Sequence, residues 1–312
     1  MPPTTDIPFK IRVEKEPLSP TYRHCLATIA LQKDAPEDTI RTNLNPIRQT
    51  HSFENWYATQ PIDRGQYGKI SYAYNDDVLF GHATLYQKAL ADDLRAIYKD
   101  LVALLNSTHY ALLRAWHYLP SLDELDDYQV FCDARARAFA TLQPSFYCAA
   151  TVIGTHCDYG VIYFLATRKA GITINNPRQT LPHLYPKRYG QAAPRFARAT
   201  LKQWGNQSDL YISGTAAIVG HESMHEGDAD AQLAEVLRNV ETLLDEASTI
   251  GKMQFKHLQH SKLYVDHSIV GNIAALIDKY FPSQNRLQVF EGQMCRRELL
   301  VEMEAMATAD SA

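Results

Sequence analysis

The chain contains the same helix-then-strand pattern twice, and this duplication constrains its fold more than any other feature. Apolar residues recur at helical spacing over residues 84–106 and again over residues 229–247. A strand pattern follows each helix, at residues 110–119 in the first half and 258–265 in the second. A glycine precedes each helix, and these two glycines lie 146 residues apart. The sequence therefore predicts two units of similar plan.

Length and composition agree with two units. At 312 residues the chain is long enough for two domains of about 150 residues. We therefore expect an α+β fold with domains at residues 1–143 and 144–312, each a mixed sheet with helices on one face. Before the first unit, the Pro-, Thr- and Asp-rich first 50 residues predict one short strand, residues 9–13, and otherwise loops.

Charge and cysteine content exclude several classes of protein. A net charge of -4 argues against a general nucleic-acid binder. No uncharged apolar run approaches 18 residues, and the N-terminus lacks a secretory pattern, so we expect a cytoplasmic protein without a membrane span. The five cysteines are odd in number, widely spaced and without a CxxC pair, which favours reduced thiols over disulfides or a structural zinc site.

The last strand pattern, residues 295–305, carries two carboxylates within its alternating part. Apolar residues occupy every second position from Leu299 to Ala305, while Glu302 and Glu304 share the other face. A partly buried carboxyl group has a raised pKa, as a general acid near neutral pH requires. The alternative is an exposed edge strand whose glutamates are solvated.

The segment His221-Glu222-Ser223-Met224-His225 matches the HExxH signature of zinc proteases. That signature requires a helix, so that both histidines lie on one face. Here Gly220 and Gly227 leave room for little more than one turn, and residues 210–219 resemble a strand that turns at glycine. A zinc-dependent hydrolase that uses His221 and His225 remains an alternative function.

Arginine and tyrosine are concentrated between residues 176 and 199, in a stretch broken by four prolines. An arginine guanidinium can bind a carboxylate through two hydrogen bonds, and a tyrosine can add a third donor. The stretch therefore suits a small dianionic ligand, although a solvated surface loop is the alternative. In the first half, Tyr128 and Arg135 lie seven residues apart, hence on one face of a predicted helix that starts near residues 126–127; an ordinary amphipathic helix is the alternative.

Residues 210–215, Gly227-Asp228, Gln232 and residues 236–244 resemble the Rid (YjgF-like) superfamily, in which a strand ending in Ser-Gly leads through a Gly-Asp turn to a helix. The closing residues 301–307 are similar to the last strand of that superfamily. A Rid-type imine hydrolase would carry an arginine about 15 residues before the terminal glutamate, but position 287 is leucine, which disfavours that activity.

Nearly the whole chain resembles a narrower family, the chorismatases or hydroxybenzoate synthases. The resemblance rests on Trp116-His117-Tyr118-Leu119-Pro120, residues 128–135, Asn176-Pro177-Arg178-Gln179, Tyr185-Pro186, residues 194–199, residues 213–222, and Cys295-Arg296 with Glu302. It implies two Rid/YjgF-like (chorismate-mutase-like) domains, of which the first is degenerate. It also places the HExxH segment in a Gly-His-Glu turn of the family that binds no metal.

The resemblance implies an enzyme that removes the enolpyruvyl group of chorismate as pyruvate, with no metal, organic cofactor or obligate protein partner. Glu302 would be the proton donor. The implied substrate-binding residues are Tyr128, Arg135, Tyr185, Arg198 and, as a further candidate, Arg178. A non-catalytic protein that binds a small metabolite is a second alternative, and it would keep this cluster without needing Glu302.

The resemblance also bears on the product. Family members with cysteine at the position of Cys295 form 3-hydroxybenzoate, and members with a small apolar residue there form a dihydrodiol. Cys295 therefore implies an aromatic product, the alternative being a packed, inert thiol. His117 and the pair Ala217-Ile218 resemble the subgroup that makes both 3- and 4-hydroxybenzoate.

Overall fold

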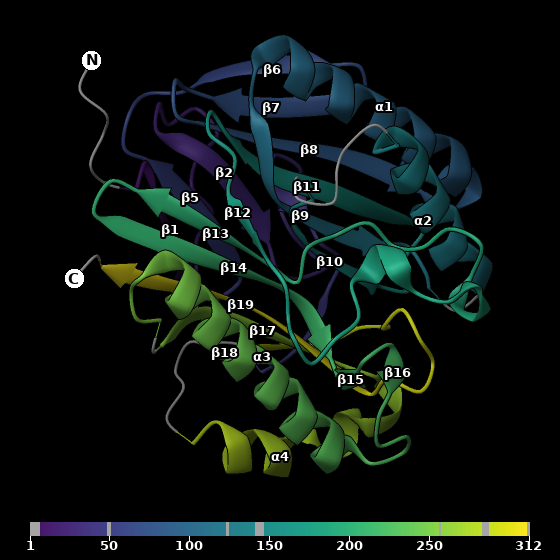
Figure 1. Ribbon diagram of the computed structural model, residues 1–312. Coiled ribbons are helices and arrows are strands. Elements are labelled where there is room, and N and C mark those ends of the chain that lie inside the picture. The colour runs from purple at the N-terminus through teal and green to yellow at the C-terminus, as the bar shows by residue number, and fades with distance from the viewer. Residues whose placement is uncertain are drawn as a thin grey trace.

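Three β-sheets of four, six and seven strands, together with a two-stranded hairpin, account for the strands in the part of the chain that the structure describes (Figure 1). The structure is a computed structural model, and it describes residues 7–48, 51–122, 125–140, 147–255, 257–282 and 287–310. The two larger sheets each carry helices on one face, which confirms the expected α+β class.

The first unit is the six-stranded sheet, whose order is β10-β9-β11-β8-β7-β6. Its elements are β6 (Asp63–Tyr67), β7 (Ile70–Tyr74), β8 (Val78–Tyr86), η1 (Gln87–Ala89), α1 (Leu90–Thr108), β9 (Ala111–Leu119), α2 (Leu125–Ala138), β10 (Ala149–Gly154) and β11 (Tyr159–Thr167). Only β9 and β10, which α2 connects, pair in parallel. Helices α1 and α2 lie together on one face of this sheet (Figure 1).

The second unit is the seven-stranded sheet, whose order is β12-β13-β14-β19-β17-β18-β4. Its elements are β12 (Ile172–Ile174), η3 (Pro182–Leu184), η4 (Lys187–Tyr189), β13 (Ala199–Trp204), β14 (Gln207–Ala216), β15 (Ile218–Val219), β16 (Glu222–Ser223), α3 (Ala229–Gly251), β17 (Leu258–Val265), η5 (His267–Asn272), α4 (Ile273–Tyr280), β18 (Leu287–Glu291) and β19 (Val301–Asp310). Strands β17 and β18 pair in parallel across α4. The N-terminal strand β4 (Asn45–Arg48) is added at the edge beside β18.

The sheet orders confirm the predicted duplication. In the first unit the last strand, β11, lies between β8 and β9, the sheet strands on either side of α1 along the chain. In the second unit the last strand, β19, lies between β14 and β17, the sheet strands on either side of α3. The boundary expected between residues 143 and 144 lies outside the described residues. Strand β11 belongs to the first unit and the next strand, β12, belongs to the second, so the chain passes from one unit to the other between Thr167 and Ile172.

The strand patterns at residues 110–119 and 258–265 are confirmed by β9 and β17. The first helix, predicted from residue 84, begins at Leu90, because β8 continues to Tyr86. The helical spacing counted Leu85, which instead belongs to the alternating end of β8 and is buried against the same core as the helix. The second predicted helix, residues 229–247, is confirmed and extends to Gly251 as α3.

The prediction of loops after the first strand is wrong, because the N-terminal region forms a third sheet. Its order is β1-β5-β2-β3, with β1 (Phe9–Glu14), β2 (Cys25–Ala30), β3 (Ile40–Arg41) and β5 (Phe53–Ala58). Strand β1 confirms the one strand expected here. Strand β2 is buried along its whole length, so its sequence lacks the alternation that marks a half-exposed strand.

The three sheets share a common core rich in aromatic side chains. Trp56 from the N-terminal sheet, Trp116 from the first unit and Tyr211 and Tyr264 from the second are all buried in it. Separate apolar cores lie between each larger sheet and its helices. The two units are therefore packed against each other through their sheets, with the helices on the outside (Figure 1). Among the described helices, none combines the length and apolar character needed to cross a bilayer.

Candidate active site

Glu302 lies on β19, a central strand flanked by β14 and β17. It pairs with Ala216 on one side and Tyr264 on the other, and only 5% of its surface is exposed. Glu304 on the same face is also buried. The alternative of an exposed edge strand with solvated glutamates is therefore wrong, since neighbouring strands and the first unit cover both carboxylates.

Gly214 on β14 makes room for the carboxyl group of Glu302. A Cβ atom at residue 214 would overlap Oε1 of Glu302, so a larger side chain would displace that carboxyl group. The register of β14 against β19 also shifts between Ile212 and Thr215. The glycine and the irregular pairing together let the carboxyl group lie against the backbone of β14.

The pKa of Glu302 is raised to about 8, chiefly by burial and secondly by the negative charge of Glu304. The positive charges of Arg114 and Arg198 oppose this shift but do not cancel it. Among the described side chains, none donates a hydrogen bond to this carboxyl group, so nothing of that kind stabilises its charged form. Glu302 is therefore mainly protonated at neutral pH.

Glu304, in contrast, is held by cations. It accepts hydrogen bonds from Arg114 Nη2 at 2.8 Å and from Trp116 Nε1 at 3.1 Å, and Lys262 Nζ lies 3.4 Å away. Lys262 also pairs with the buried Glu54 of the N-terminal sheet at 2.9 Å. This buried network joins all three sheets, and it keeps a charged carboxylate close to Glu302.

A cavity opens in front of Glu302, with about 470 Å³ of empty space when the solvent at its mouth is counted. It lies between the two units, with α2, β9 and β10 on one side and β14, β19 and the 194–196 loop on the other. Its lining consists of His117, Tyr128, Phe131, Cys132, Arg135, Ala150, Thr151, Val152, Pro194, Arg195, Phe196, Gly214, Cys295 and Glu302. Four of the predicted site residues, Tyr128, Arg135, Cys295 and Glu302, therefore meet in one cavity.

Arg135 is buried without a carboxylate partner among the described residues. Its guanidinium donates to the Arg195 carbonyl at 2.7 Å, to the Tyr98 hydroxyl at 3.0 Å and to His117 Nε2 at 3.2 Å. All three acceptors are neutral. Because a buried charge without a counterion is costly, this side of the cavity is suited to an anionic group.

Arg198 and Tyr185 form a second cationic group beside the cavity. Arg198 Nη2 donates to the Tyr185 hydroxyl at 2.6 Å and to the Thr180 carbonyl at 3.1 Å. Its Nε is buried without a hydrogen-bond partner in the described part of the chain. Neither side chain lines the cavity itself, but the charge of Arg198 acts on the Glu302 carboxyl group.

Tyr128 and Cys295 are neutral groups of the cavity. Burial, with the charge of Glu302 as the next cause, raises the pKa of Cys295 to about 12, so its sulfur is a thiol and not a nucleophilic thiolate. Burial likewise raises the pKa of Tyr128 well above its ordinary value. Both groups can shape the cavity and donate hydrogen bonds.

Two predicted residues, Arg178 and Ala217, lie elsewhere. Arg178 pairs with Glu235 on α3 and donates to Asn239 Oδ1 at 3.1 Å. Ala217 is fully buried in the core between α3 and its sheet. Neither residue reaches the cavity, because both face α3.

Sequence reasoning did not identify several cavity residues, notably His117, Thr151 and Arg195 as members of the site. The sequence points to His117 only through its place in the Trp116-His117-Tyr118 block and through the resemblance to the subgroup that makes both 3- and 4-hydroxybenzoate. A single histidine in a strand of apolar residues gives no local signal for a site, and Thr151 gives none either. Arg195 lay in the arginine-rich stretch, which was the one signal available for it.

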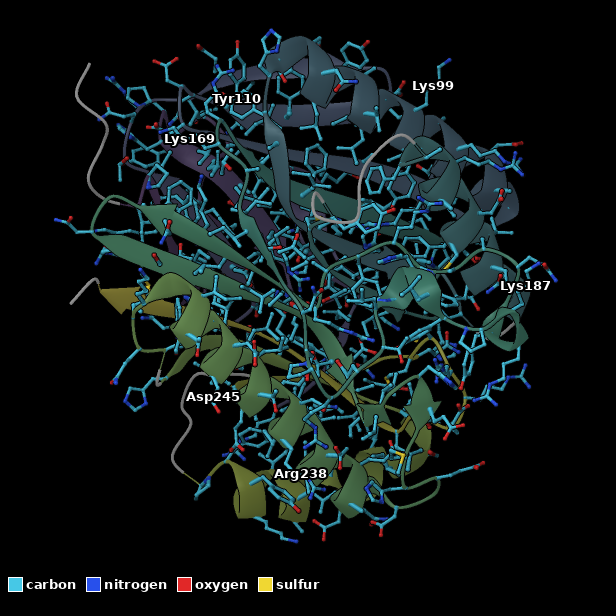
Figure 2. The ribbon with its side chains drawn as sticks, in the orientation of Figure 1. Lys99, Tyr110, Lys169, Lys187, Arg238 and Asp245 are labelled. Carbon is cyan, nitrogen blue, oxygen red and sulfur yellow. The ribbon has the colours of Figure 1, made fainter. Side chains whose placement is uncertain are left out.

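The HExxH segment forms no helix, which excludes the zinc-protease geometry. Strands β15 and β16 pair as a hairpin, and His225 has a left-handed backbone with φ of 58°. His221 Nδ1 lies 3.1 Å from Arg188 Nη2, and Glu222 pairs with Arg188 at 2.9 Å. The segment thus contacts the η4 loop, whose Lys187 points out from the surface (Figure 2). Within the described ranges, no three His, Cys, Asp or Glu side chains are placed to bind a metal.

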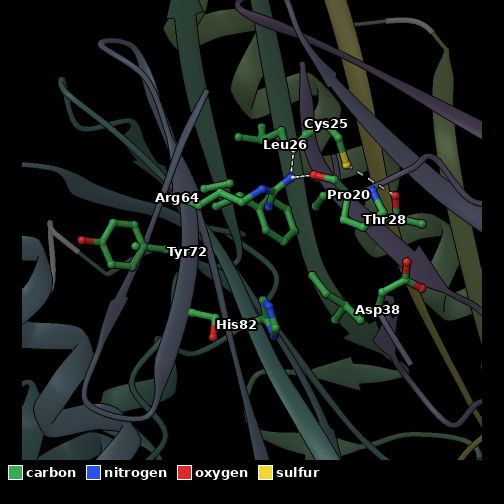
Figure 3. Close-up of a pocket in the computed structure, with 14 residues that line it drawn as sticks. Pro20, Cys25, Leu26, Thr28, Asp38, Arg64, Tyr72 and His82 are labelled. Atoms are coloured by element: carbon green, nitrogen blue, oxygen red, sulfur yellow. Dashed lines mark hydrogen bonds between the residues drawn. The ribbon is translucent and has the colours of Figure 1, made fainter. Parts of the chain in front are cut away.

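A second cavity lies between β2 and β3 of the N-terminal sheet and β6 to β8 of the first unit (Figure 3). Arg64 at this cavity donates to the carbonyls of Pro20 and Cys25 (Figure 3). Arg64 and Asp38 at this cavity are exposed, whereas the buried Glu302 lines the cavity between the two units. The cavity at Glu302 is therefore the candidate active site.

Comparison with known proteins agrees with this geometry. Residues 54–166 match the family model described as Chorismatase FkbO/Hyg5-like, N-terminal. A "Chorismatase" of Streptomyces rapamycinicus is 31% identical over 299 residues, which cover 89% of this chain and 88% of that protein. The chain belongs to the chorismatase family. A "3-hydroxybenzoate synthase" of Streptomyces hygroscopicus is 30% identical over 273 residues, covering 81% of this chain and 80% of that protein.

The chorismatase fold extends over nearly all of the chain. A crystal structure of a chorismatase superposes with a TM-score of 0.84 and 29% identity, covering 96% of this chain and 98% of that one. The family-model match ends at residue 166, next to the end of β11, which agrees with a change of unit after Thr167. In this member of the chorismatase family, the cavity at Glu302 thus lies where the two units meet.

Proposed function

We propose that this protein cleaves chorismate to pyruvate and 3-hydroxybenzoate, with 4-hydroxybenzoate as a second product. One observation carries the proposal: two buried arginines, Arg135 and Arg198, lie near a protonated buried carboxyl group, Glu302, and neither has a carboxylate partner in the described part of the chain. Chorismate has two carboxylates and an enol ether that is cleaved after protonation. The names of the two relatives, a chorismatase and a 3-hydroxybenzoate synthase, support the same substrate.

The arginines bind the two carboxylates of the substrate. Arg135 with Tyr128 binds one of them, and Arg198 with Tyr185 binds the other. Arg178 is left out of this set because Glu235 already neutralises it. The substrate carboxylate bound by Arg198 cancels part of the positive charge that lowers the pKa of Glu302. Substrate binding therefore favours the protonated form of Glu302.

Glu302 is the general acid. Its proton passes to the methylene carbon of the enolpyruvyl group, and the π electrons of that group form the new C–H bond. The ether oxygen stabilises the resulting oxocarbenium ion, which is trapped by water or by rearrangement within the substrate. Formation of a hydroxybenzoate and pyruvate from chorismate adds and removes no atoms, so the overall reaction needs no oxidant or reductant.

Cys295 selects the aromatic product. Its neutral thiol lies in the cavity with Glu302, where its sulfur shapes the space beside the ring. Replacement by alanine, Cys295→Ala, is expected to shift the products from hydroxybenzoates toward pyruvate and a dihydrodiol. The 4-hydroxybenzoate product rests on the resemblance at His117 and Ala217; Ala217 can act only through packing, because it does not reach the cavity.

The test is to incubate purified, EDTA-treated protein with chorismate and to separate the products by liquid chromatography. Pyruvate with 3- and 4-hydroxybenzoate is the expected result. Glu302→Gln should lose turnover while still binding chorismate. Pyruvate with a dihydrodiol alone would contradict the role of Cys295. Binding of chorismate without turnover, unchanged in Glu302→Gln, would instead support the alternative of a non-catalytic metabolite-binding protein.

A further inference from the structure

His117 on β9 is buried at the cavity with a defined tautomer. Its Nδ1 lies 2.7 Å from the carbonyl oxygen of Thr151 on the neighbouring strand β10. Because a carbonyl oxygen only accepts, Nδ1 must carry the proton. In the neutral ring, Nε2 then has a lone pair and is a hydrogen-bond acceptor.

Nε2 of His117 faces Arg135 and Tyr98. The Tyr98 hydroxyl lies 2.9 Å from Nε2 and Arg135 Nη1 lies 3.2 Å from it, while Nη1 also lies 3.0 Å from the Tyr98 oxygen. Tyr98 therefore donates to Nε2 and accepts from Arg135. A doubly protonated ring would direct an N–H group at the guanidinium. Burial, and next the charge of Arg135, lower the pKa of His117 well below its ordinary value, so the ring is neutral.

These contacts hold Arg135 from both units, and its Nη2 also lies 3.7 Å from the sulfur of Cys148. Its Nε donates to the Arg195 carbonyl of the second unit, and its Nη1 donates to Tyr98 and His117 of the first unit. A carboxylate in place of the histidine would hold the guanidinium as well, but it would also neutralise its charge. A neutral acceptor holds the guanidinium and leaves its charge available to an anionic ligand.

We propose that His117 is a positioning residue: its neutral Nε2 fixes the Arg135 guanidinium for a substrate carboxylate without cancelling the charge that binds it. The inference rests on the proposed function, in which Arg135 binds a carboxylate of chorismate. Position 117 therefore requires a side chain that is a neutral hydrogen-bond acceptor, and not only one of the size of histidine.

An isosteric pair of variants separates charge from shape. Glutamine and glutamate both place an oxygen near the position of Nε2, and both lose the Nδ1 hydrogen bond to Thr151. His117→Gln keeps a neutral acceptor, whereas His117→Glu forms an ion pair with Arg135. We expect KM for chorismate to stay within about threefold in His117→Gln and to rise by about tenfold to a hundredfold in His117→Glu, since charge-assisted hydrogen bonds contribute about 1.5–3 kcal/mol.

Tyr98→Phe provides a second test that is independent of substitutions at His117. It removes the hydroxyl that bridges Arg135 and His117, so KM should rise severalfold with a smaller change in kcat. Thermal unfolding of each variant controls for folding. Equal KM values in His117→Gln and His117→Glu would overturn the inference, because a merely structural role does not distinguish a neutral acceptor from a charged one.

Equilibrium dialysis with 3-hydroxybenzoate as an anionic probe keeps the inference separate from the proposed reaction. If the unmodified protein does not turn over chorismate, the proposed function fails, but the affinity for this carboxylate still compares the two variants. Binding that weakens in His117→Glu and persists in His117→Gln supports the positioning role. Binding that is equal in both variants overturns it.

Discussion

Replacing Glu302 by glutamine should raise the free energy of unfolding relative to the unmodified protein, and this gain should grow as the pH rises. The glutamate has a pKa of about 8 in the folded state against an ordinary value of 4.5. Below pH 4.5 this carboxyl group is protonated in both the folded and the unfolded protein, so its titration does not lower the free energy of unfolding. Between the two values the unfolded chain releases the proton while the folded protein keeps it, so stability falls as the pH rises. Glutamine has the same shape and no such titration.

The size of the effect follows from the two pKa values. Each unit of pKa difference corresponds to about 1.4 kcal/mol, so Glu302→Gln should gain about 3 kcal/mol over the unmodified protein at pH 7 and about 5 kcal/mol above pH 8. These are upper values, since water that enters the cavity reduces the cost of the charged form. Near pH 4.5 the two proteins should be equally stable.

The measurement is urea unfolding of the unmodified protein and of Glu302→Gln at several pH values from 5 to 9. Glu241→Gln, on an exposed position of α3, is the matched control, and its stability difference should stay within about 0.5 kcal/mol across the range. A difference between the unmodified protein and Glu302→Gln that stays constant over this range would refute the reasoning, because it would mean that burial does not hold the proton on this carboxyl group.

Three further predictions concern activity. Gly214→Ala should reduce kcat at least a hundredfold by displacing the Glu302 carboxyl group, whereas Gly271→Ala, where a Cβ meets open space, should leave kcat unchanged; steady-state rates and thermal unfolding of both variants check this. Arg135→Met should raise KM for chorismate by about tenfold or more, and Arg178→Met, which removes only the pairing with Glu235 and Asn239, should not; an unaltered KM in the first variant would count against the carboxylate site. The value of kcat/KM should fall as the pH rises through about 8, because the proton donor Glu302 is then ionised, and Glu302→Asp should move the inflection; a flat profile up to pH 10 would contradict the proton-donor role.

The duplication and most of its elements could be predicted from the sequence, because periodicity reports which face of a helix or strand is apolar. The alternation at residues 299–305 located the strand that carries Glu302, although β19 begins only at Val301 because residues 295–298 form a turn. The spacing of Tyr128 and Arg135 placed both on one face of α2. The glycines around the HExxH segment correctly argued against a helix there. All of these are local signals, which a stretch of ten to twenty residues can carry.

The third sheet and parts of the site could not be predicted in this way. Strand β2 is buried on both faces, so it has no alternation to detect. Arg178 has the same side chain as Arg135, and only the packing of α3 shows that Glu235 neutralises it. His117 has no local feature that marks it as the acceptor for Arg135.

The sequence by itself determined that two similar α+β units exist, that a strand with Glu302 closes the second, and that arginines and tyrosines accompany it. The tertiary structure alone decided that this strand is central, that Glu302 is buried beside Glu304, and that the partners of Arg135 among the described residues are neutral. The reason is physical. Burial and charge compensation depend on segments such as β9, β14 and α2, which lie far from β19 along the chain and meet it only when the two units pack together.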